Sequence, residues 1–244
     1  MIRGAVLCGV VVGLWAALSA FGGVPAFLLP SPAEVAAALW GNAAYLAQNA
    51  LVTGGEILLG LFVGTVLGSL AALLIASSSA LQRWVMPLLV VSQAVPVFAL
   101  APLMVLWLGF GLSSKVALAV LVIFFPVTAN FLDGLRRTEP GWLDLAATMG
   151  AKPWRVLIYL RVPAALPALA SGLRVAAAVA PIGAVLGEWV GASSGLGYVM
   201  LSANARIQTA LMFAALIVLA IMSVALYVAV DKSLRTWLRW VPGG

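Results

Sequence analysis

Residues 144–163 read DLAATMGAKPWRVLIYLRVP, in a chain where only 8% of the residues are charged. The stretch holds one acid, three cations, a glycine and two prolines. Asp144 would lie in the first turn of a helix, where an acid complements the helix dipole. Gly150 would end that helix, because glycine readily adopts the left-handed turn at a helix terminus. Pro153 then suits the first turn of a second helix, which Pro163 closes. The stretch therefore predicts a compact helix-turn-helix.

The composition indicates a membrane protein. Of the 244 residues, 64% are hydrophobic, whereas soluble domains average about half. Several runs approach the roughly 18 apolar residues that a membrane-spanning helix needs. We expect an all-α membrane protein whose six transmembrane helices cover residues 4–22, 56–77, 84–109, 114–135, 164–190 and 209–230, with an interfacial segment at 23–55. The alternative for the first 22 residues is a secretory signal peptide.

Two of the predicted spans have distinctive features. Pro96 predicts that the third span is a broken helix, because proline removes a backbone donor and leaves carbonyls that need partners. Gly60, Gly64 and Gly68 share one face of the second span and would let another helix approach closely. That helix belongs either to the same chain or to a second copy of it.

The distribution of Lys and Arg predicts the orientation of the chain. With both termini in the cytoplasm, ten of the 13 cations fall on the inner side, and only Lys115 and Arg206 fall outside. Arg174 lies inside the fifth span. The ten inner cations are Arg3, Arg83, Arg136, Arg137, Lys152, Arg155, Arg161, Lys232, Arg235 and Arg239. Residues 137–163 then form the largest cytoplasmic loop.

Several classes of function are disfavoured. The net charge of +6 does not indicate nucleic acid, because the cations lie in short gaps between apolar runs. Cys8 is the single cysteine, so no intrachain disulfide forms. The chain has no histidine and no paired-carboxylate pattern, which argues against a metal site or catalytic residues of a membrane enzyme. A secondary transporter, the main alternative outside the family named below, would need a second broken helix, and a channel is equally disfavoured.

The predicted hairpin is unusually apolar for a loop. Its apolar side chains are Leu143, Met149, Trp154, Leu157, Ile158 and Tyr159. Either some of them tuck under the helical bundle or touch the lipid interface, or they form an apolar docking surface, rimmed by charge, for a cytoplasmic partner.

At this loop the sequence resembles the membrane subunits of bacterial ABC importers that work with a binding protein. Their loop carries Glu-Ala-Ala, three residues, Gly, nine residues and Ile-x-Leu-Pro, and this chain has Asp144-Leu145-Ala146, Gly150 and Leu160-Arg161-Val162-Pro163 at the same spacing. Leu145 enlarges a position that is usually small. The residues expected to couple to a partner ATPase are Asp144, Ala146, Gly150 and Pro163 from the motif, and Lys152, Trp154 and Arg155 from their surface chemistry.

The resemblance implies a type I ABC importer (MetI-like) permease fold. It implies a single transmembrane permease domain over residues 1–244, a multi-pass location in the bacterial inner membrane, and a homodimer. The implied partners are two cytoplasmic ATPase subunits, which would bind ATP and Mg²⁺, and an external or periplasmic binding protein. No GxxxxGK[ST] phosphate loop occurs in the chain, so the permease is expected to be no enzyme and to hold no cofactor itself.

Two further stretches narrow the resemblance. VPVFALAPLMVLWLGFGLSSK at 95–115 and GEWVGASSGLGYVM at 187–200 resemble the nitrate, sulfonate, taurine and thiamine-precursor branch of these importers. The likeness is greatest to permeases for the pyrimidine precursor of thiamine. Riboflavin, sulfonate or taurine, and nitrate are the alternative cargoes.

Polar and aromatic side chains within the spans are candidates for lining the substrate path, because polar groups in lipid usually face an interior. The candidates are Gln93, Phe98, Phe124, Asn130 and Glu188. Gln93 either satisfies carbonyls freed by Pro96 or lines the path, and the aromatic residues either stack on a flat cargo or pack. Glu188 either forms part of an outer gate, contacts the binding protein or pairs with Arg206. Thr128 is expected to bond back to its own helix.

Overall fold

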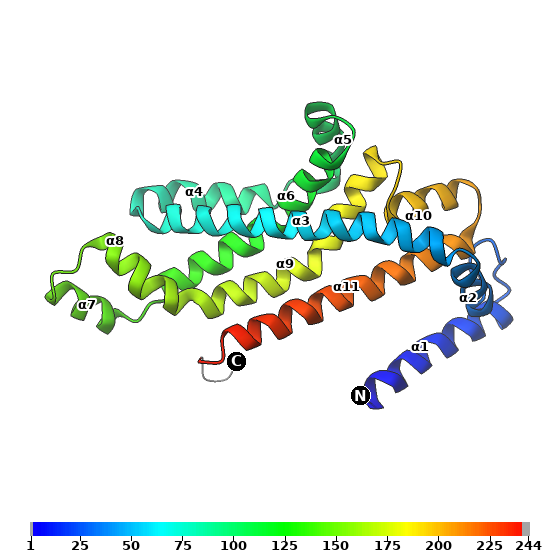
Figure 1. Cartoon of the computed structure of the whole chain (residues 1–244), viewed down its shortest axis with the longest axis horizontal. Coiled ribbons are helices and arrows are strands. Elements are labelled where there is room, and N and C mark those ends of the chain that lie inside the picture. The colour runs from blue at the N-terminus through cyan, green and yellow to red at the C-terminus, as the bar shows by residue number, and fades with distance from the viewer. Residues whose placement is uncertain (1, 241–244) are drawn as a thin grey trace.

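The computed structural model describes residues 2–240, without the side chains of residues 2–5, 7, 8 and 79. Every regular element in that range is a helix, which confirms the all-α prediction (Figure 1). The side chains of Arg3 and Cys8 lie outside the described residues. The elements are α1 (Ile2–Phe21), α2 (Pro32–Gly41), α3 (Ala43–Ala76), α4 (Ser79–Ser92), α5 (Val97–Leu108), α6 (Leu112–Arg136), α7 (Pro140–Thr148), α8 (Pro153–Val156), the π-helical turn η1 (Leu157–Arg161), α9 (Val162–Gly191), α10 (Leu196–Ala205) and α11 (Thr209–Trp237).

Among the described residues, four helices are long and apolar enough to cross a membrane. They are α3, α6, the continuous helix Pro153–Gly191, and α11. The pair α4 and α5 makes a fifth if it is counted as one span, bent by 99°. The apolar part of α1 that could be assessed, Gly9–Phe21, is shorter, so the first of the six predicted spans stays a prediction.

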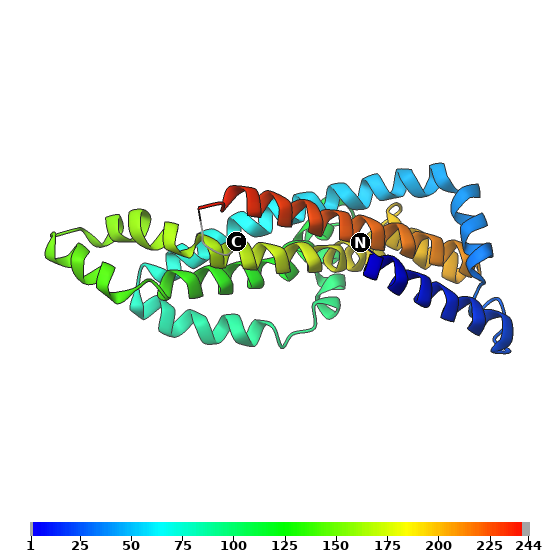
Figure 2. The same ribbon diagram turned by 90° about the horizontal axis from the view of Figure 1, so that it is seen from below.

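The long helices run lengthwise, and α6 lies among them (Figures 1 and 2). It packs most extensively against α9 and then α3, and Leu118, Ile123 and Leu135 of α6 are fully buried. The α7–α8 hairpin forms one end of the molecule, whereas α2 and α10 lie at the other (Figure 1). The two ends are therefore joined directly by packed helices.

The interfacial segment predicted for residues 23–55 is shorter than expected. The predicted cap at Ser31 is confirmed, since its hydroxyl accepts a hydrogen bond from the Glu34 N–H while the Glu34 carboxylate binds the Ser31 N–H. However, α2 ends at Gly41 and α3 begins at Ala43 rather than near residue 56. After Pro32 no further proline interrupts the chain before Pro87, so the helix of the second span extends backward to Ala43.

Candidate functional site

The hairpin has the predicted glycine turn. Helix α7 ends at Thr148, and Gly150 has a φ of +68°, the left-handed conformation that glycine adopts most easily. The N–H of Ala151 donates to the carbonyl of Ala146 at 3.0 Å, which completes a Schellman termination. Asp144 was expected in the first turn, but α7 already begins at Pro140, so Asp144 lies beyond that turn.

The second arm of the hairpin differs from the prediction at Pro163. Rather than closing a helix, Pro163 lies inside one that runs from Pro153 to Gly191. The N–H of Val162 donates to the carbonyl of Leu157, five residues back, in the π-helical turn η1. This wider turn carries the helix through the proline, which has no N–H of its own. Arg161 Nε also donates to the carbonyl of Leu135 at 3.0 Å, which ties this arm to the end of α6.

An apolar groove of about 470 Å³ lies between the two arms of the hairpin. Its lining residues are Trp142, Leu145, Ala146, Met149, Ala151, Arg155, Val156, Tyr159 and Leu160. Met149 and Tyr159 are 78% and 73% exposed, so these side chains are not tucked under the bundle. We name this set the hairpin groove.

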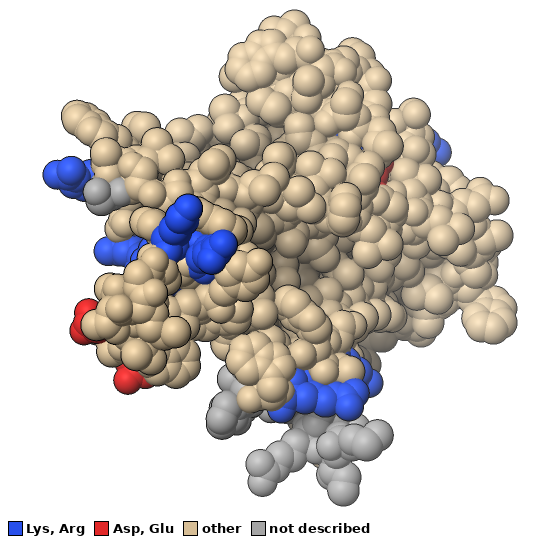
Figure 3. Space-filling view, turned by 60° about the vertical axis from the view of Figure 1, so that its left-hand side comes forward, with Lys and Arg blue, Asp and Glu red and all other residues tan. Residues whose placement is uncertain are grey.

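The predicted coupling residues divide between the hairpin groove and its surroundings. Ala146 and Arg155 line the groove, and the Arg155 guanidinium lies 5.3 Å from the ring centroid of Trp154, which is half exposed. Asp144 and Lys152 are exposed outside it. In Figure 3 most of the visible Lys and Arg side chains lie at the left and at the bottom of the view, whereas most of the remaining surface is uncharged.

The predicted break of the third span is confirmed, and a cavity lies beside it. Helix α4 ends at Ser92, and Pro96 caps α5. The cavity of about 320 Å³ is lined by Ser92, Gln93, Val95, Val97, Leu100, Leu121, Val122 and Phe124. The structure thus brings Gln93 and Phe124 together from two separate spans.

The other candidates for the substrate path lie elsewhere. Phe98 is 66% exposed and does not line the cavity. The Asn130 side chain donates to the carbonyl of Pro126 on its own helix at 2.7 Å. Thr128 bonds back to the carbonyl of Phe124 as expected, at 2.7 Å, and also lies 3.2 Å from the carbonyl of Gly68.

Glu188 is buried in a polar cluster that the sequence did not reveal. It accepts hydrogen bonds from the Thr53 hydroxyl at 2.6 Å and from the N–H of Gly197. The alternative pairing with Arg206 is wrong, because Glu188 is 1% exposed whereas Arg206 is exposed. Lys115, counted above as an external loop cation, is also buried, and its Nζ lies 2.6 Å from Glu56 Oε1.

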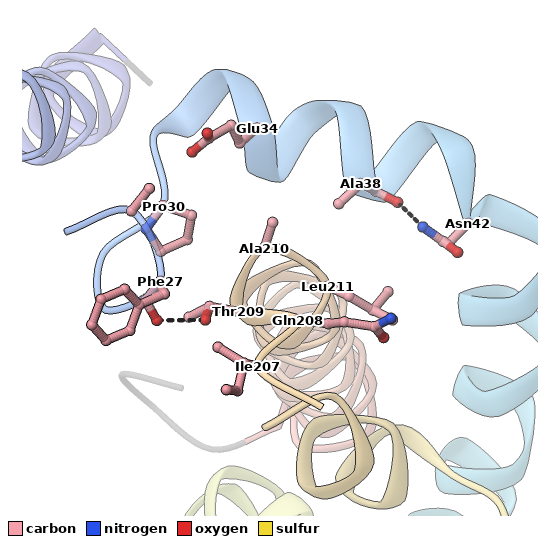
Figure 4. A pocket seen from close by; sticks show the side chains of 11 residues that line it. Phe27, Pro30, Glu34, Ala38, Asn42, Ile207, Gln208, Thr209, Ala210 and Leu211 are labelled. Atoms are coloured by element: carbon pink, nitrogen blue, oxygen red, sulfur yellow. Dashed lines mark hydrogen bonds between the residues drawn. The ribbon is translucent and has the colours of Figure 1, made fainter. Parts of the chain in front are cut away.

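A groove of about 520 Å³ lies at the end opposite the hairpin, between the segment around α2 and the start of α11 (Figure 4). Thr209 Oγ1 donates to the carbonyl of Phe27 at 2.6 Å and joins its two sides. Ile207 lines this groove with a φ of +57°, an unusual value for a β-branched residue. We name it the outer groove; no motif in the sequence indicated it.

Comparisons with known proteins agree on one family. The family model of the binding-protein-dependent transport system inner membrane component matches residues 64–237. A probable ABC transporter permease protein of Haemophilus influenzae is 49% identical over 238 residues, which cover 98% of this chain and 97% of the relative. The formylaminopyrimidine transport permease ThiX of Halalkalibacterium halodurans is 39% identical over 215 residues, which cover 88% and 86%.

The fold also matches a solved structure. The inward-facing MetNI methionine ABC transporter superposes with a TM-score of 0.70 at 20% sequence identity, over 80% of this chain and 97% of the matched chain. At this identity the likeness establishes the fold alone, and it confirms the predicted MetI-like architecture.

Proposed function

Since the chain belongs to the family of binding-protein-dependent transport system inner membrane components, we propose that its hairpin groove receives an ATPase and that its helices pass a small organic nutrient inward. The chain is the multi-pass permease subunit of an ABC importer in the bacterial inner membrane, and the ATPase is a separate subunit. ATP and Mg²⁺ bind on that subunit in this proposal.

The observation that carries the coupling role is the exposed apolar groove at the tip of the hairpin. A loop meant only to be solvated would not expose Leu145, Met149 and Tyr159 together. An apolar centre with charged residues such as Lys152 at its edge is the usual anatomy of a protein interface. Because η1 and α9 continue the second arm into a membrane span, a force on the groove reaches the transmembrane helices through one continuous helix.

The turn at Gly150 provides the test of coupling. Proline fixes φ near −65° and cannot adopt the observed +68°, whereas asparagine tolerates the left-handed region. In vesicles containing the ATPase and the binding protein, we expect Gly150→Pro to lower uptake about tenfold or more relative to ATP hydrolysis. Gly150→Asn, the matched control, should keep uptake within about twofold. Normal uptake by the proline variant would refute the coupling role.

We propose that the external binding protein docks over the outer groove and that the permease works as a homodimer. The outer groove is lined by residues of α2 and the start of α11, which lie at the end of the molecule opposite the hairpin (Figure 1). In this arrangement the long helices connect the site of delivery to the site of ATP-driven force. The mass of the purified complex, measured in detergent, tests the proposed two permease and two ATPase subunits.

For the cargo, we propose a thiamine pyrimidine precursor. The cavity beside the α4–α5 break pairs the Phe124 ring with the Gln93 amide, which offers stacking and hydrogen bonding to a small heteroaromatic ring. Its volume of about 320 Å³ falls at the small end of ligand pockets. The likeness to the formylaminopyrimidine permease supports the same class.

The proposed partner binding protein gives the most direct test of the cargo. We expect formylaminopyrimidine to raise its melting temperature more than riboflavin, taurine or nitrate does, because ligand binding to the native state stabilises it. If only riboflavin, taurine or nitrate raised the melting temperature, that compound would be the cargo instead of formylaminopyrimidine. That result would leave the role of the hairpin groove untouched.

A further inference from the structure

Four helices meet at the buried polar cluster. Helix α3 contributes Thr53 and Glu56, α6 contributes Lys115, and α9 contributes Glu188. The fourth contribution is the backbone N–H groups at the start of α10, which hydrogen-bond to these side chains and to Asn49. Glu56, Lys115 and Glu188 are only 2%, 6% and 1% exposed.

The charges of the cluster do not balance if both carboxyls are ionised. The Lys115 ammonium neutralises Glu56, at 2.6 Å. Within the described residues Glu188 makes no ion pair, and the cation of the cluster, Lys115, is already paired with Glu56. A buried and uncompensated carboxylate costs several kcal/mol, and two carboxylates that share a site hold one proton between them more readily than none.

One carboxyl oxygen of the cluster lacks a hydrogen-bond donor. Glu56 Oε2 is buried and has no donor among the described residues. Glu56 lies one helical turn after Thr53 on α3, and the Thr53 hydroxyl donates to Glu188 Oε1 at 2.6 Å, so the two carboxyls are neighbours in the cluster. Two ionised carboxylates have only acceptor oxygens, so Glu188 can serve as the partner of Glu56 Oε2 only if one of the two carboxyls carries a hydrogen.

We propose that Glu56 and Glu188 form a proton-binding site, in which one proton bridges the two carboxyls and holds the start of α10 on α3. The proton leaves a carboxyl–carboxylate pair that together with Lys115 is neutral. It gives Glu56 Oε2 the partner it otherwise lacks, and it leaves the Glu188 oxygens free to accept from Thr53 and Gly197.

The main argument for an ionised Glu188 is its position near the N-terminus of α10, where N–H groups favour an anion. Those N–H groups are largely occupied by other acceptors. Gly195 N–H donates to Asn49 Oδ1 at 2.7 Å and Leu196 N–H donates to Thr53 Oγ1 at 2.8 Å, so only the N–H of Gly197 reaches Glu188. One such bond does not offset burial beside the Glu56 carboxylate.

The turn between α9 and α10 packs closely against the Glu188 carboxyl. A Cβ atom on Gly195 would lie 2.1 Å from Glu188 Oε1, and one on Gly197 would lie 2.8 Å from Glu188 Oε2. Both glycines therefore let the backbone of the α9–α10 turn rest directly on the carboxyl.

Glutamine at position 188 separates the two protonation states. Its amide oxygen can accept from Gly197, and its NH₂ can donate to Glu56 Oε2, as the protonated acid does. The Thr53 hydroxyl, which would then face the NH₂, keeps the carbonyl of Asn49 as its acceptor. In the assembled transporter in detergent, we expect Glu188→Gln to unfold within about 2 °C of the wild type. Glu188→Ala, which removes the bridge, should unfold at least about 5 °C lower. A glutamine variant as unstable as the alanine variant would overturn the proposal.

Infrared spectroscopy gives a second and independent readout. A buried protonated carboxyl contributes its own C=O band, and we expect this band in the wild type and its loss in Glu188→Gln. Asp133→Asn is the control, because Asp133 is half exposed and pairs with Arg137 at the surface. The control should leave the band unchanged. A wild-type spectrum without a protonated carboxyl band would refute the site even if the glutamine variant failed to fold.

Discussion

Individual glycines set the distance between α3 and α6. A Cβ atom on Gly60 would lie 2.5 Å from the Ala119 Cβ, and one on Gly64 would lie 2.7 Å from Ile123. A Cβ atom on Gly68 would lie 3.0 Å from the Val127 Cβ, on the next turn of α6. Of the two partners left open by the sequence, the helix that approaches this face is therefore one of the same chain.

Alanine substitutions along α3 test this close packing. Gly60→Ala forces Ala119 and the backbone behind it to move, and we expect the free energy of unfolding to fall by about 1–3 kcal/mol. Gly55→Ala, in the same helix but exposed and with open space around it, should instead stabilise by about 0.5–1 kcal/mol. Thermal unfolding of both purified variants checks the pair. Equal effects of the two substitutions would contradict this account.

Local sequence predicted some residues well and long-range partners poorly. The left-handed turn at Gly150 and the back-bond of Thr128 follow from neighbours a few residues away. The partner of Lys115 lies 59 residues away in sequence, and that of Glu188 lies 135 residues away. No periodicity within one helix reveals such pairs, because they depend on how the helices pack. The outer groove was missed for the same reason.

At the scale of elements, prolines gave both the best and the worst predictions. Pro96 lies where α4 and α5 bend by 99°. Proline has no N–H to donate to a carbonyl of the preceding turn, so the helix does not continue through this point. Pro163 was expected to end a helix, but η1 shifts the hydrogen bonding just before it. A single proline therefore marks a possible break, and the neighbouring backbone determines whether the helix continues.

The function of the hairpin groove can be tested by adding a negative charge to α7. We expect Leu145→Glu to weaken binding of the ATPase subunit about tenfold or more, since it places a carboxylate in the apolar centre of the groove. Thr148→Glu adds the same charge to α7 at an exposed position that does not line the groove, and it should change binding less than about threefold. Co-purification and titration of the ATPase against each variant measure the difference. If both variants bound alike, the groove would not be the docking surface.

At the scale of the whole molecule, function is proposed at both ends and along the helices between them. The hairpin groove and the outer groove lie at opposite ends (Figure 1), and the cavity at Gln93 and Phe124 lies beside the break between α4 and α5. The treatment of residues 1–244 as one permease domain, with a coupling loop at 137–163, stays a prediction. So does the side of the membrane on which each end lies.

The membrane orientation rests on the charge bias and can be measured directly. Without Lys115, which is buried in an ion pair, the outer end keeps only Arg206 against ten inner cations, so the bias toward cytoplasmic termini is stronger than the sequence suggested. In a background with Cys8 replaced by Ala, we expect a membrane-impermeant maleimide to label Asn204→Cys in intact spheroplasts. Thr236→Cys, exposed near the end of α11, should react only after the membrane is opened. The Cys8→Ala parent is the unlabelled control, and the reverse pattern would place the hairpin outside the cell, where no ATPase could reach it.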